Sequence, residues 1–245
     1  MPQLELSGQR IFYFERGAEG TPLLFIHGAG GGHSNWLALI KQLEPRRCIA
    51  LDLPGHGLSP GDGCDTVEEY ARLVKGFASA LCPNTKTIAV GHSMGGLVAT
   101  CFASRNRNIL GGLILISSGF SPPSEPPSKV PSKEEICRML YSREALIQKC
   151  IQQRLFMLDR PEVLLKDLRA SACFDYSKHK LNESIPKFVL TGKNDRRVAL
   201  QTTQTAAKFL KAPLKIIPDC GHMPMIEKPI DTSKAIQQFL KGQFI

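Results

Sequence analysis

The sequence of 245 residues predicts an α/β fold built on a mostly parallel β-sheet. Continuous apolar runs recur along the chain, and several end at Gly or Asp, a pattern typical of strands buried on both faces. Residues 66–81 lie between two such runs and carry apolar side chains three and four positions apart, as an amphipathic helix does. Strand and helix patterns therefore alternate, which favours parallel strands joined by helical crossovers.

Eight segments are predicted to be strands. Residues 3–6 and 10–14 flank a Ser7-Gly8 turn, which indicates two short strands at the start of the chain. The buried apolar runs that follow predict strands over residues 22–26, 48–51, 87–90, 113–116, 187–190 and 214–217.

The segments between these strands contain the predicted helices. Helical patterns cover residues 66–81, 97–103, 202–210 and 231–240. Residues 97–103 are almost wholly apolar, so we expect this helix to pack directly on the sheet.

Residues 121–185 interrupt the alternation, because they contain no strand-like run. The segment opens with Pro122-Pro123 and Pro126-Pro127, typical of an extended hinge. Helical patterns then cover residues 133–141, 143–155 and 162–172. We interpret residues 1–120 and 186–245 as one core domain and residues 121–185 as a small helical cap. A helical crossover with no gating role is the alternative.

Composition and charge exclude several classes of protein. Hydrophobic residues are 42% and no apolar run approaches the roughly 18 residues of a membrane span, so no span is expected.

The eight cysteines form no CxxC pair and the first residues show no export signal, which favours reduced thiols in a cytoplasmic protein without a metal site. The net charge is +9, and residues 186–245 contribute +6 of it without a nucleic-acid-binding motif. We therefore expect no nucleic-acid partner.

Gly91-His92-Ser93-Met94-Gly95 matches the G-x-S-x-G pattern, which presents a nucleophilic serine on a strand-to-helix turn. The match alone is weak, because a glycine-rich turn with an incidental serine has the same letters. Its context supports it: a buried strand precedes the motif directly and a predicted helix follows. Small flanking residues let the turn close tightly and lift the Ser93 hydroxyl out of the sheet at a helix N-terminus. Ser93 is the candidate nucleophile.

A serine hydroxyl needs a base at neutral pH, and His222 is the candidate. It lies in Gly221-His222-Met223-Pro224, on the loop just after the last predicted strand. Asp195 follows the preceding strand and emerges at the same sheet edge, where it is placed to orient the imidazole. The order Ser93, Asp195, His222 is that of serine hydrolases with an α/β sheet.

Acyl transfer also needs hydrogen-bond donors for the developing oxyanion. Residues 27–32, His-Gly-Ala-Gly-Gly-Gly, follow a buried strand and let the backbone approach a ligand closely. By the usual pattern of such sites, the amides of Ala29 and Met94 are the expected donors. A phosphate-binding loop is the rival, but neither a GK[ST] nor a spaced G-x-G-x-x-G is present.

These motifs resemble those of the α/β-hydrolase superfamily, in its esterase and lipase-like branch. Asp52-Leu53-Pro54-Gly55-His56-Gly57-Leu58-Ser59 is similar to the family's D-x-P-G-H-G-x-S turn, and residues 27–28 and 221–224 resemble its oxyanion and histidine loops. The resemblance covers nearly the whole chain outside residues 121–185. It implies the α/β-hydrolase fold: a mostly parallel eight-stranded sheet flanked by helices, with strand 2 antiparallel and a helical cap after strand 6.

Other titratable residues are expected to have no catalytic role. The resemblance implies a structural role for His56, and His92 is expected to pack at the turn. His33 and His179 are expected to be solvated. Asp219 is only three residues from His222 on a turn, where a carboxylate rarely faces the imidazole.

We expect a serine carboxylesterase that hydrolyses small-molecule esters of short to medium acyl chains, without cofactor or metal, as a monomer or homodimer. Arg196 and Arg197 follow the acid and are expected to favour anionic substrates. We expect the substrate to be bound by Phe120, Tyr141, Phe156 and Met157. A place in the core of the cap is the alternative role for each of them.

Several alternatives share the fold and the serine. A serine at position 93 argues against epoxide and haloalkane hydrolases of this family, which use aspartate there. Lactonases, carbon–carbon bond hydrolases, aminopeptidases, perhydrolases and a menaquinone-pathway lyase remain open, although the arginine expected after the turn in the lyase is absent from Gly96-Leu97-Val98. A signalling receptor that retains the triad also remains open, and turnover of p-nitrophenyl esters separates it from an enzyme.

Overall fold

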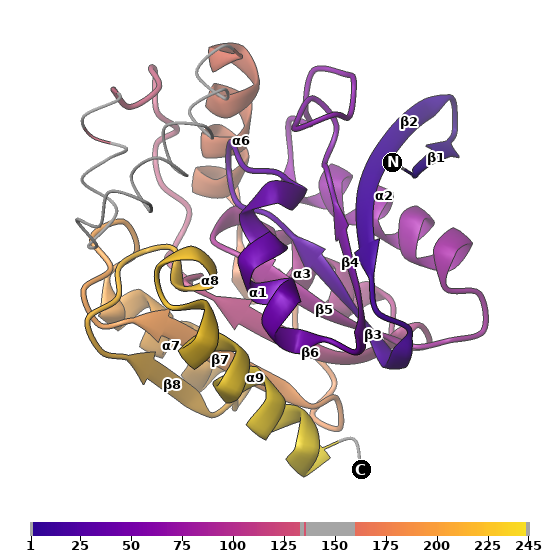
Figure 1. Ribbon diagram of the computed structural model, residues 1–245. Coiled ribbons are helices and arrows are strands. Elements are labelled where there is room, and N and C mark those ends of the chain that lie inside the picture. Colours follow the sequence, from indigo (N-terminus) through magenta and orange to yellow (C-terminus); the bar gives the residue numbers. More distant parts are fainter. Residues whose placement is uncertain (1, 133–134, 136–159, 244–245) are drawn as a thin grey trace.

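The computed structural model describes residues 2–132, 135 and 160–243. Eight strands form one sheet in the order β1-β2-β4-β3-β5-β6-β7-β8 (Figure 1). They are β1 (Gln3–Leu6), β2 (Gln9–Arg16), β3 (Glu19–Ile26), β4 (Arg46–Leu51), β5 (Thr87–His92), β6 (Leu110–Ile116), β7 (Lys187–Gly192) and β8 (Leu214–Ile217). Each strand contains a predicted strand segment, so the predicted eight-stranded sheet is confirmed.

Strand direction follows the predicted pattern. β2 is antiparallel to both of its neighbours, β1 and β4. From β4 to β8 all neighbouring strands are parallel. The second strand is therefore the antiparallel one, as the resemblance implies.

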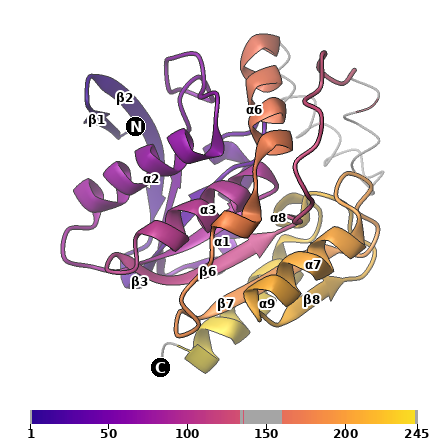
Figure 2. The same cartoon turned by 180° about the vertical axis from the view of Figure 1, so that it is seen from behind.

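Helices cover both faces of the sheet. α1 (Leu37–Leu43) and α9 (Pro229–Gln243) lie against one face (Figure 1), while α2 (Val67–Leu81), α3 (Met94–Arg105) and α7 (Leu200–Leu210) cover the other (Figure 2). Successive side chains of a strand point to opposite faces. Accordingly Leu23 and Phe25 pack in the core beneath α1 and α9, while Leu24 and Ile26 pack in the core beneath α2 and α3. Burial of both faces explains why the strands are continuous apolar runs.

The strand order determines where functional loops meet. β3 lies between β4 and β5, and Ile26 at its end is in register with Leu51 of β4 and Gly91 of β5. The chain therefore leaves β3 toward one side and later returns on the other side to form β5. Such a reversal opens a crevice at the carboxyl ends of parallel strands. The glycine-rich loop after β3 and the turn that holds Ser93 adjoin at this edge of the sheet.

The insertion follows β6, as predicted. Its described helices are α6 (Pro161–Cys173), which matches the helix predicted over residues 162–172, and the 3-10 turn η3 (Tyr176–Lys178). The helices predicted over 133–141 and 143–155 fall almost entirely outside the described residues. The division into a core domain and a cap stays a prediction.

Two described α-helices have no counterpart among the predicted elements. α1 and α8 (Pro224–Glu227) have seven and four residues, too short for a helical period to stand out. α3 begins at Met94 rather than near residue 97. Gly95 and Gly96 lower the intrinsic helix propensity there, but the tight turn before the helix requires small residues.

Two observations concern the expected absence of a membrane span and the expected reduced state of the cysteines. Among the described residues, no helix is long and apolar enough to cross a membrane. The described cysteines, 48, 64, 82, 101, 173 and 220, are all free thiols.

A buried carboxylate organises the loop after β4. Asp52 accepts hydrogen bonds from the backbone amides of His33 and Leu58 and lies 2.9 Å from Nδ1 of His33. Burial alone raises the pKa of Asp52, but the His33 side chain and the amides outweigh it, so this pKa lies below its ordinary value. The expectation that His33 is solvated is wrong, because its side chain is only 13% exposed and is engaged by Asp52.

Replacing Asp52 by Asn is expected to lower the free energy of unfolding by about 3 kcal/mol at neutral pH, since an amide cannot accept from all of these donors. The pKa of Asp52 is lower in the folded chain than in the unfolded chain. Its stabilisation is therefore present above the unfolded pKa of about 3.9 and is lost as the pH falls through the folded value. Urea unfolding at neutral and acidic pH should show the difference between wild type and D52N shrinking on acidification.

Glu5→Gln is the control for this prediction, because it removes an exposed carboxylate from β1. Its unfolding free energy should stay within about 0.5 kcal/mol of wild type. A D52N deficit that is constant across the pH range contradicts the assigned role of the Asp52 charge.

Candidate active site

Ser93 occupies a strained turn between β5 and α3. Its backbone angles are φ 51° and ψ −120°, a conformation that costs a non-glycine residue on the order of 1–3 kcal/mol. Neighbouring groups hold it there: the Ser93 amide donates to the carbonyl of Ile116 at 3.0 Å, and the Ser118 hydroxyl donates to the Ser93 carbonyl at 2.8 Å. The turn is therefore held from the adjacent strand β6, and Ser93 is partly exposed at the sheet edge.

Glycines let the elements around Ser93 approach closely. A Cβ atom at Gly95 would collide with the backbone carbonyl oxygens of Ile26 and His27, so the first turn of α3 packs directly on the end of β3. A Cβ atom at Gly28 would lie 3.0 Å from Cβ of Ser93. The glycine-rich loop after β3 therefore adjoins Ser93, as the predicted oxyanion site requires.

The loops after β7 and β8 bring Asp195 and His222 together. The amides of Lys193 and Asn194 donate to the carbonyls of Ile217 and Cys220, each at 2.8 Å, which ties the two loops to one another. His222 Nδ1 lies 2.9 Å from Oδ2 of Asp195, and their side chains are 8% and 1% exposed. The sequence placed these residues at one sheet edge, and the structure brings them into contact.

Asp195 is held as a charged acceptor. Its Oδ1 accepts hydrogen bonds from the amides of Arg197 at 2.8 Å and Val198 at 2.9 Å. Burial raises the pKa of Asp195, but the His222 hydrogen bond and these amides lower it by a larger amount. The pKa therefore lies below its ordinary value, which favours the charged carboxylate. A carboxylate beside Nδ1 makes that nitrogen the donor and leaves Nε2 free to accept a proton.

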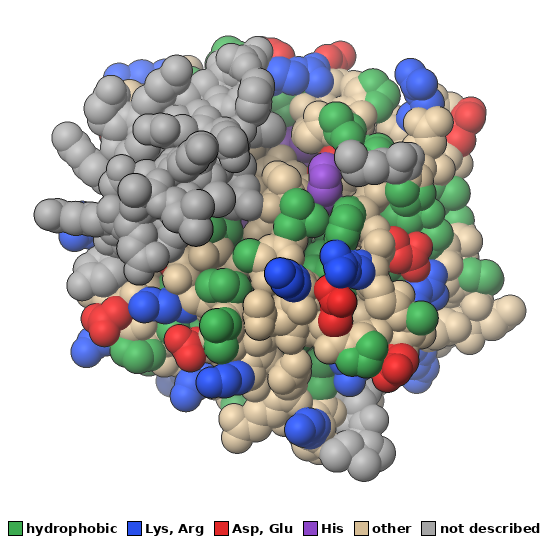
Figure 3. Space-filling model, in the orientation of Figure 1, with side chains coloured by type: hydrophobic (Ala, Val, Ile, Leu, Met, Phe, Trp, Pro, Cys, Tyr) green, Lys and Arg blue, Asp and Glu red, His purple; other side chains and the backbone are tan. Residues whose placement is uncertain are grey.

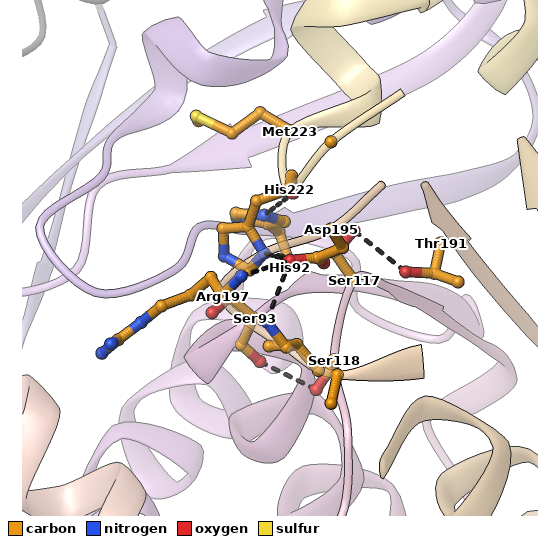
Figure 4. Close-up of polar contacts among 12 residues, drawn as sticks. His92, Ser93, Ser117, Ser118, Thr191, Asp195, Arg197, His222 and Met223 are labelled. Atoms are coloured by element: carbon orange, nitrogen blue, oxygen red, sulfur yellow. Dashed lines mark hydrogen bonds and ion pairs between the residues drawn. The ribbon is translucent and has the colours of Figure 1, made fainter. Parts of the chain in front are cut away.

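Ser93, His222 and Asp195 form one cluster in Figure 4. Between the described side chains of Ser93 and His222 the structure has no hydrogen bond. Catalytic hydrogen bonds are often long in the absence of substrate and shorten in the reactive complex. The catalytic roles of Ser93, Asp195 and His222 stay predictions, supported by this arrangement.

His92 links the turn at Ser93 to the histidine loop. Its Nε2 donates to the carbonyl oxygen of His222 at 2.9 Å, and the two imidazole centroids are 4.8 Å apart (Figure 4). Burial, and then the neighbouring His222, lower the pKa of His92 to about 3, so it is neutral. A neutral imidazole that donates to the backbone holds the loop in place, which agrees with the packing role predicted for His92.

Glu227 holds the histidine loop from the other side. Its carboxylate oxygens accept the amide hydrogens of Gly221 and Met223, each at 2.9 Å. These residues flank His222, so a single buried side chain fixes the backbone on both sides of the imidazole. The sequence reasoning missed Glu227, because a glutamate five residues after a histidine has no distinctive spacing.

The predicted oxyanion donors lie on the two adjoining loops. The amides of Ala29 and Met94 donate to no other described residue, so both are available to a ligand. The loop around Ala29 is closed by a hydrogen bond from the Gly31 amide to the Gly28 carbonyl at 2.9 Å. The oxyanion role stays a prediction, which the free amides and the nearby Ser93 support.

Of the four residues predicted to bind the substrate, the structure describes only Phe120. Phe120 is buried, stacks on Tyr176 with ring centroids 4.9 Å apart, and meets Phe209 edge-on at 5.6 Å. These contacts place Phe120 in the main hydrophobic core, and its role in substrate binding stays a prediction. Tyr141, Phe156 and Met157 lie outside the described residues.

One group of described residues has the composition of a metal site. Glu68, Cys101 and His179 each offer a ligand atom, and these atoms lie within 4.8 Å of one another. His179 Nε2 is 3.2 Å from Glu68, and the His179 residue is 2% exposed, so the expectation that it is solvated is wrong. Burial raises the pKa of Cys101 to about 11, which keeps the thiol protonated. The group lies on α2, α3 and the segment after η3, and none of its members belongs to the loops of the candidate site.

On the face seen in Figure 3, Lys and Arg side chains are interspersed with Asp and Glu side chains. Arg196 and Arg197 are exposed beside Asp195, and Figure 4 shows the Arg197 guanidinium directed away from that carboxylate. The Arg197 guanidinium can therefore act on an incoming anion without neutralising the acid.

Comparisons with known families, proteins and structures give the following similarities. A model described as the Alpha/beta hydrolase family matches residues 23–235. The chain is 30% identical to the dihydrolipoyllysine-residue acetyltransferase component of the acetoin cleaving system of Pseudomonas putida, over 97% of this chain and 68% of that protein. It is 28% identical to a 2-hydroxy-6-oxononadienedioate/2-hydroxy-6-oxononatrienedioate hydrolase of Paraburkholderia phymatum, over 94% and 91%. The structure of a thermophilic esterase from Thermogutta terrifontis matches with a TM-score of 0.86 at 25% identity, covering 100% of both chains.

Proposed function

Because the chain belongs to the α/β-hydrolase family, we propose that it is a serine hydrolase that cleaves carboxylic esters through Ser93, His222 and Asp195. One observation carries the proposal. His222 is hydrogen-bonded to Asp195 at 2.9 Å, on a loop that His92 ties directly to the strained turn of Ser93. A nucleophile beside a base that is oriented by a third group is the arrangement of nucleophilic acyl transfer.

In the first step Ser93 Oγ attacks the ester carbonyl while its proton passes to Nε2 of His222. Asp195 keeps the proton of His222 on Nδ1 and stabilises the imidazolium that forms. The carbonyl oxygen becomes an oxyanion, which accepts hydrogen bonds from the amides of Ala29 and Met94. The imidazolium then protonates the departing alkoxide, and the alcohol leaves an acyl-enzyme on Ser93.

Water completes the cycle. His222 accepts a proton from a water molecule, whose oxygen attacks the acyl-enzyme and regenerates the oxyanion in the same pocket. When this intermediate collapses, Ser93 recovers its proton from His222 and the carboxylic acid is released. Both halves use the same side chains, and no redox change occurs.

Esters of short to medium acyl chains are the proposed substrates, on the basis of the small insertion and its apolar residues. The similarity to an esterase over both full chains supports ester chemistry. The P. phymatum relative favours a second candidate, hydrolysis of an oxo dicarboxylate, because its name describes a dianionic substrate. The exposed cations of Arg196 and Arg197 beside the site fit that alternative.

Serine-directed labelling tests the nucleophile. A fluorophosphonate probe is expected to modify the active protein with a stoichiometry of about one, and peptide mass spectrometry should place the adduct on Ser93. An active preparation that resists the probe, or that carries the adduct on another serine, refutes the proposal.

A substrate series tests the reaction class. Hydrolysis of p-nitrophenyl esters from acetate to dodecanoate should show multiple turnover, with the highest kcat/KM at short to medium chain length. Cleavage of an oxo dicarboxylate without turnover of any ester supports the second candidate instead. Slow single turnover of every ester would indicate a receptor.

Glu227→Gln is expected to lower kcat by about tenfold with little change in KM. One of the two backbone amides beside His222 then faces an NH₂ group instead of an acceptor, at a cost of about 1–3 kcal/mol. The imidazole loses its fixed backbone, which slows proton transfer more than substrate binding. Steady-state kinetics on p-nitrophenyl butyrate check this result.

Asp231→Asn is the matched control, because it removes an exposed carboxylate from the start of α9, close in sequence to Glu227. Its kcat and KM should equal those of wild type. Equal losses of activity in both variants mean that the histidine loop does not depend on Glu227 in particular.

A further inference from the structure

Asp167 is a carboxylate with no exposed surface on α6, the helix of the insertion. A buried charge is stable only where hydrogen-bond donors replace water. Its Oδ2 lies 2.9 Å from the amide nitrogen of Gly30 and 2.7 Å from Nε2 of His56, and its Oδ1 lies 2.6 Å from the hydroxyl of Tyr70. One side chain of the insertion therefore joins the loop after β3, the loop after β4 and helix α2.

His56 is the cation that balances Asp167. Its Nδ1 lies 2.9 Å from the carbonyl oxygen of Pro54, and its Nε2 faces Asp167. Both neighbours are acceptors, so both ring nitrogens carry protons and the imidazole is charged. Burial lowers the pKa of His56, but Asp167, the Pro54 carbonyl and Asp52 together raise it above its ordinary value, in agreement with the hydrogen bonds. The structural role implied for His56 thus extends to a buried ion pair with the insertion.

Gly30 is the partner of Asp167 that bears on catalysis. It follows Ala29, whose amide is the proposed oxyanion donor, and has φ +65° in the left-handed region that glycine tolerates. The hydrogen bond to Asp167 fixes the Ala29–Gly30 peptide, and the bond from Gly31 to Gly28 closes the turn on its other side. These two bonds together leave the Ala29 amide little freedom to rotate.

The insertion has a separate attachment that does not involve the oxyanion loop. Arg160, just before α6, donates to the carbonyl oxygens of Gly55 at 3.3 Å and Gly61 at 2.7 Å, and pairs with Asp62 at 3.1 Å. Helix α6 is therefore docked at its start by Arg160. The bond from Gly30 to Asp167 adds a direct link between this helix and the loop that carries Ala29.

We propose that Asp167 is a positioning residue for the oxyanion loop, which holds the Ala29 amide toward the substrate carbonyl through its hydrogen bond with Gly30. The proposal rests on the acyl-transfer function proposed above. It gives the insertion a part in transition-state stabilisation, because a preorganised donor needs no reorganisation when charge develops.

Two substitutions at this position test the proposal. We expect Asp167→Ala, which removes the acceptor for Gly30, to lower kcat for p-nitrophenyl butyrate by about 100-fold, and Asp167→Asn, which keeps a neutral acceptor, by about tenfold. KM should stay within about twofold of wild type, because the oxyanion forms only after binding. The rate of phosphonylation of Ser93 should fall in parallel, since its adduct is tetrahedral and uses the same donors.

Asp62→Asn is the control. Asp62 pairs with Arg160 at the surface, with a side chain 84% exposed, so this variant weakens the other attachment of α6 without touching Gly30. Its kcat should match wild type. A folded Asp167→Ala variant with wild-type kcat overturns the proposal, as does a change confined to KM or an equal loss in Asp62→Asn.

Failure of the proposed function is distinguishable from failure of this inference. Wild type that neither hydrolyses the ester nor reacts with the phosphonate refutes the function, whereas a normal wild type with a fully active Asp167→Ala refutes only the role of Asp167. If both Asp167 variants fail to fold, amide hydrogen exchange of wild type decides. The Gly30 amide should exchange at least about tenfold more slowly than the free Ala29 amide, and equal rates overturn the proposal.

Discussion

Ser93→Ala should lose ester hydrolysis by about a millionfold in kcat, leaving only the contribution of the oxyanion donors and of substrate binding. The substitution removes the one atom that forms the covalent bond in the proposed mechanism. Ser93 Oγ donates to no described residue, so its loss leaves the packing intact. Alanine also adopts the same strained backbone at a similar energetic cost.

The measurement needs purified protein free of both host esterases and wild-type protein, since a trace of either would mask a millionfold loss. Thermal unfolding should give the Tm of wild type, and the fluorophosphonate probe should leave the variant unlabelled. Ser124→Ala, at an exposed position of the insertion, is the control and should retain full activity. Ester hydrolysis by Ser93→Ala at the wild-type rate refutes the proposed mechanism.

Asp195→Asn should lower kcat by about 10⁴-fold with a smaller change in KM, as a wrong imidazole tautomer does in other triads. The amides of Arg197 and Val198 both donate to Oδ1, at 2.8 and 2.9 Å. They will hold the asparagine oxygen at that position and turn its NH₂ group toward Nδ1 of His222. That nitrogen must then accept, so the proton moves to Nε2 and the base can no longer take the proton of Ser93.

Asp219→Asn provides the matched control. It makes the same substitution on the other carboxylate near His222, at an exposed position with φ 47°, which asparagine tolerates. Its kinetics should equal those of wild type. If Asp195→Asn keeps most of its kcat, or if Asp219→Asn loses as much, the acid has been assigned wrongly.

The strands were predictable because burial on both faces leaves a local signal. Leu23 to Ile26 alternate between the two cores, so four neighbouring residues are all apolar whichever face each one meets. α1 left no such signal, since seven residues complete only about two helical turns. The same limit hid α8, although that helix places Glu227 beneath the histidine loop.

The candidate triad was predictable for a related reason. Ser93 comes directly after β5, and Asp195 and His222 lie on the loops that follow β7 and β8. The carboxyl ends of parallel strands share one edge of the sheet. Chain order and residue type were enough to bring them to the same loops. The hydrogen bond of Asp195 to His222, and the exclusion of Asp219 by its exposed position, required the folded loops.

Local periodicity and adjacent residues were enough to predict the sheet, the turn that presents Ser93 and the loops that meet at the edge of the sheet. The polar residues that support this edge come from distant parts of the chain and became visible only in the folded protein. Asp167 lies 137 positions from Gly30 and 111 from His56, and no local pattern connects residues so far apart. Their contact depends on how the insertion docks on the core, and a buried carboxylate must then find donors wherever the fold provides them.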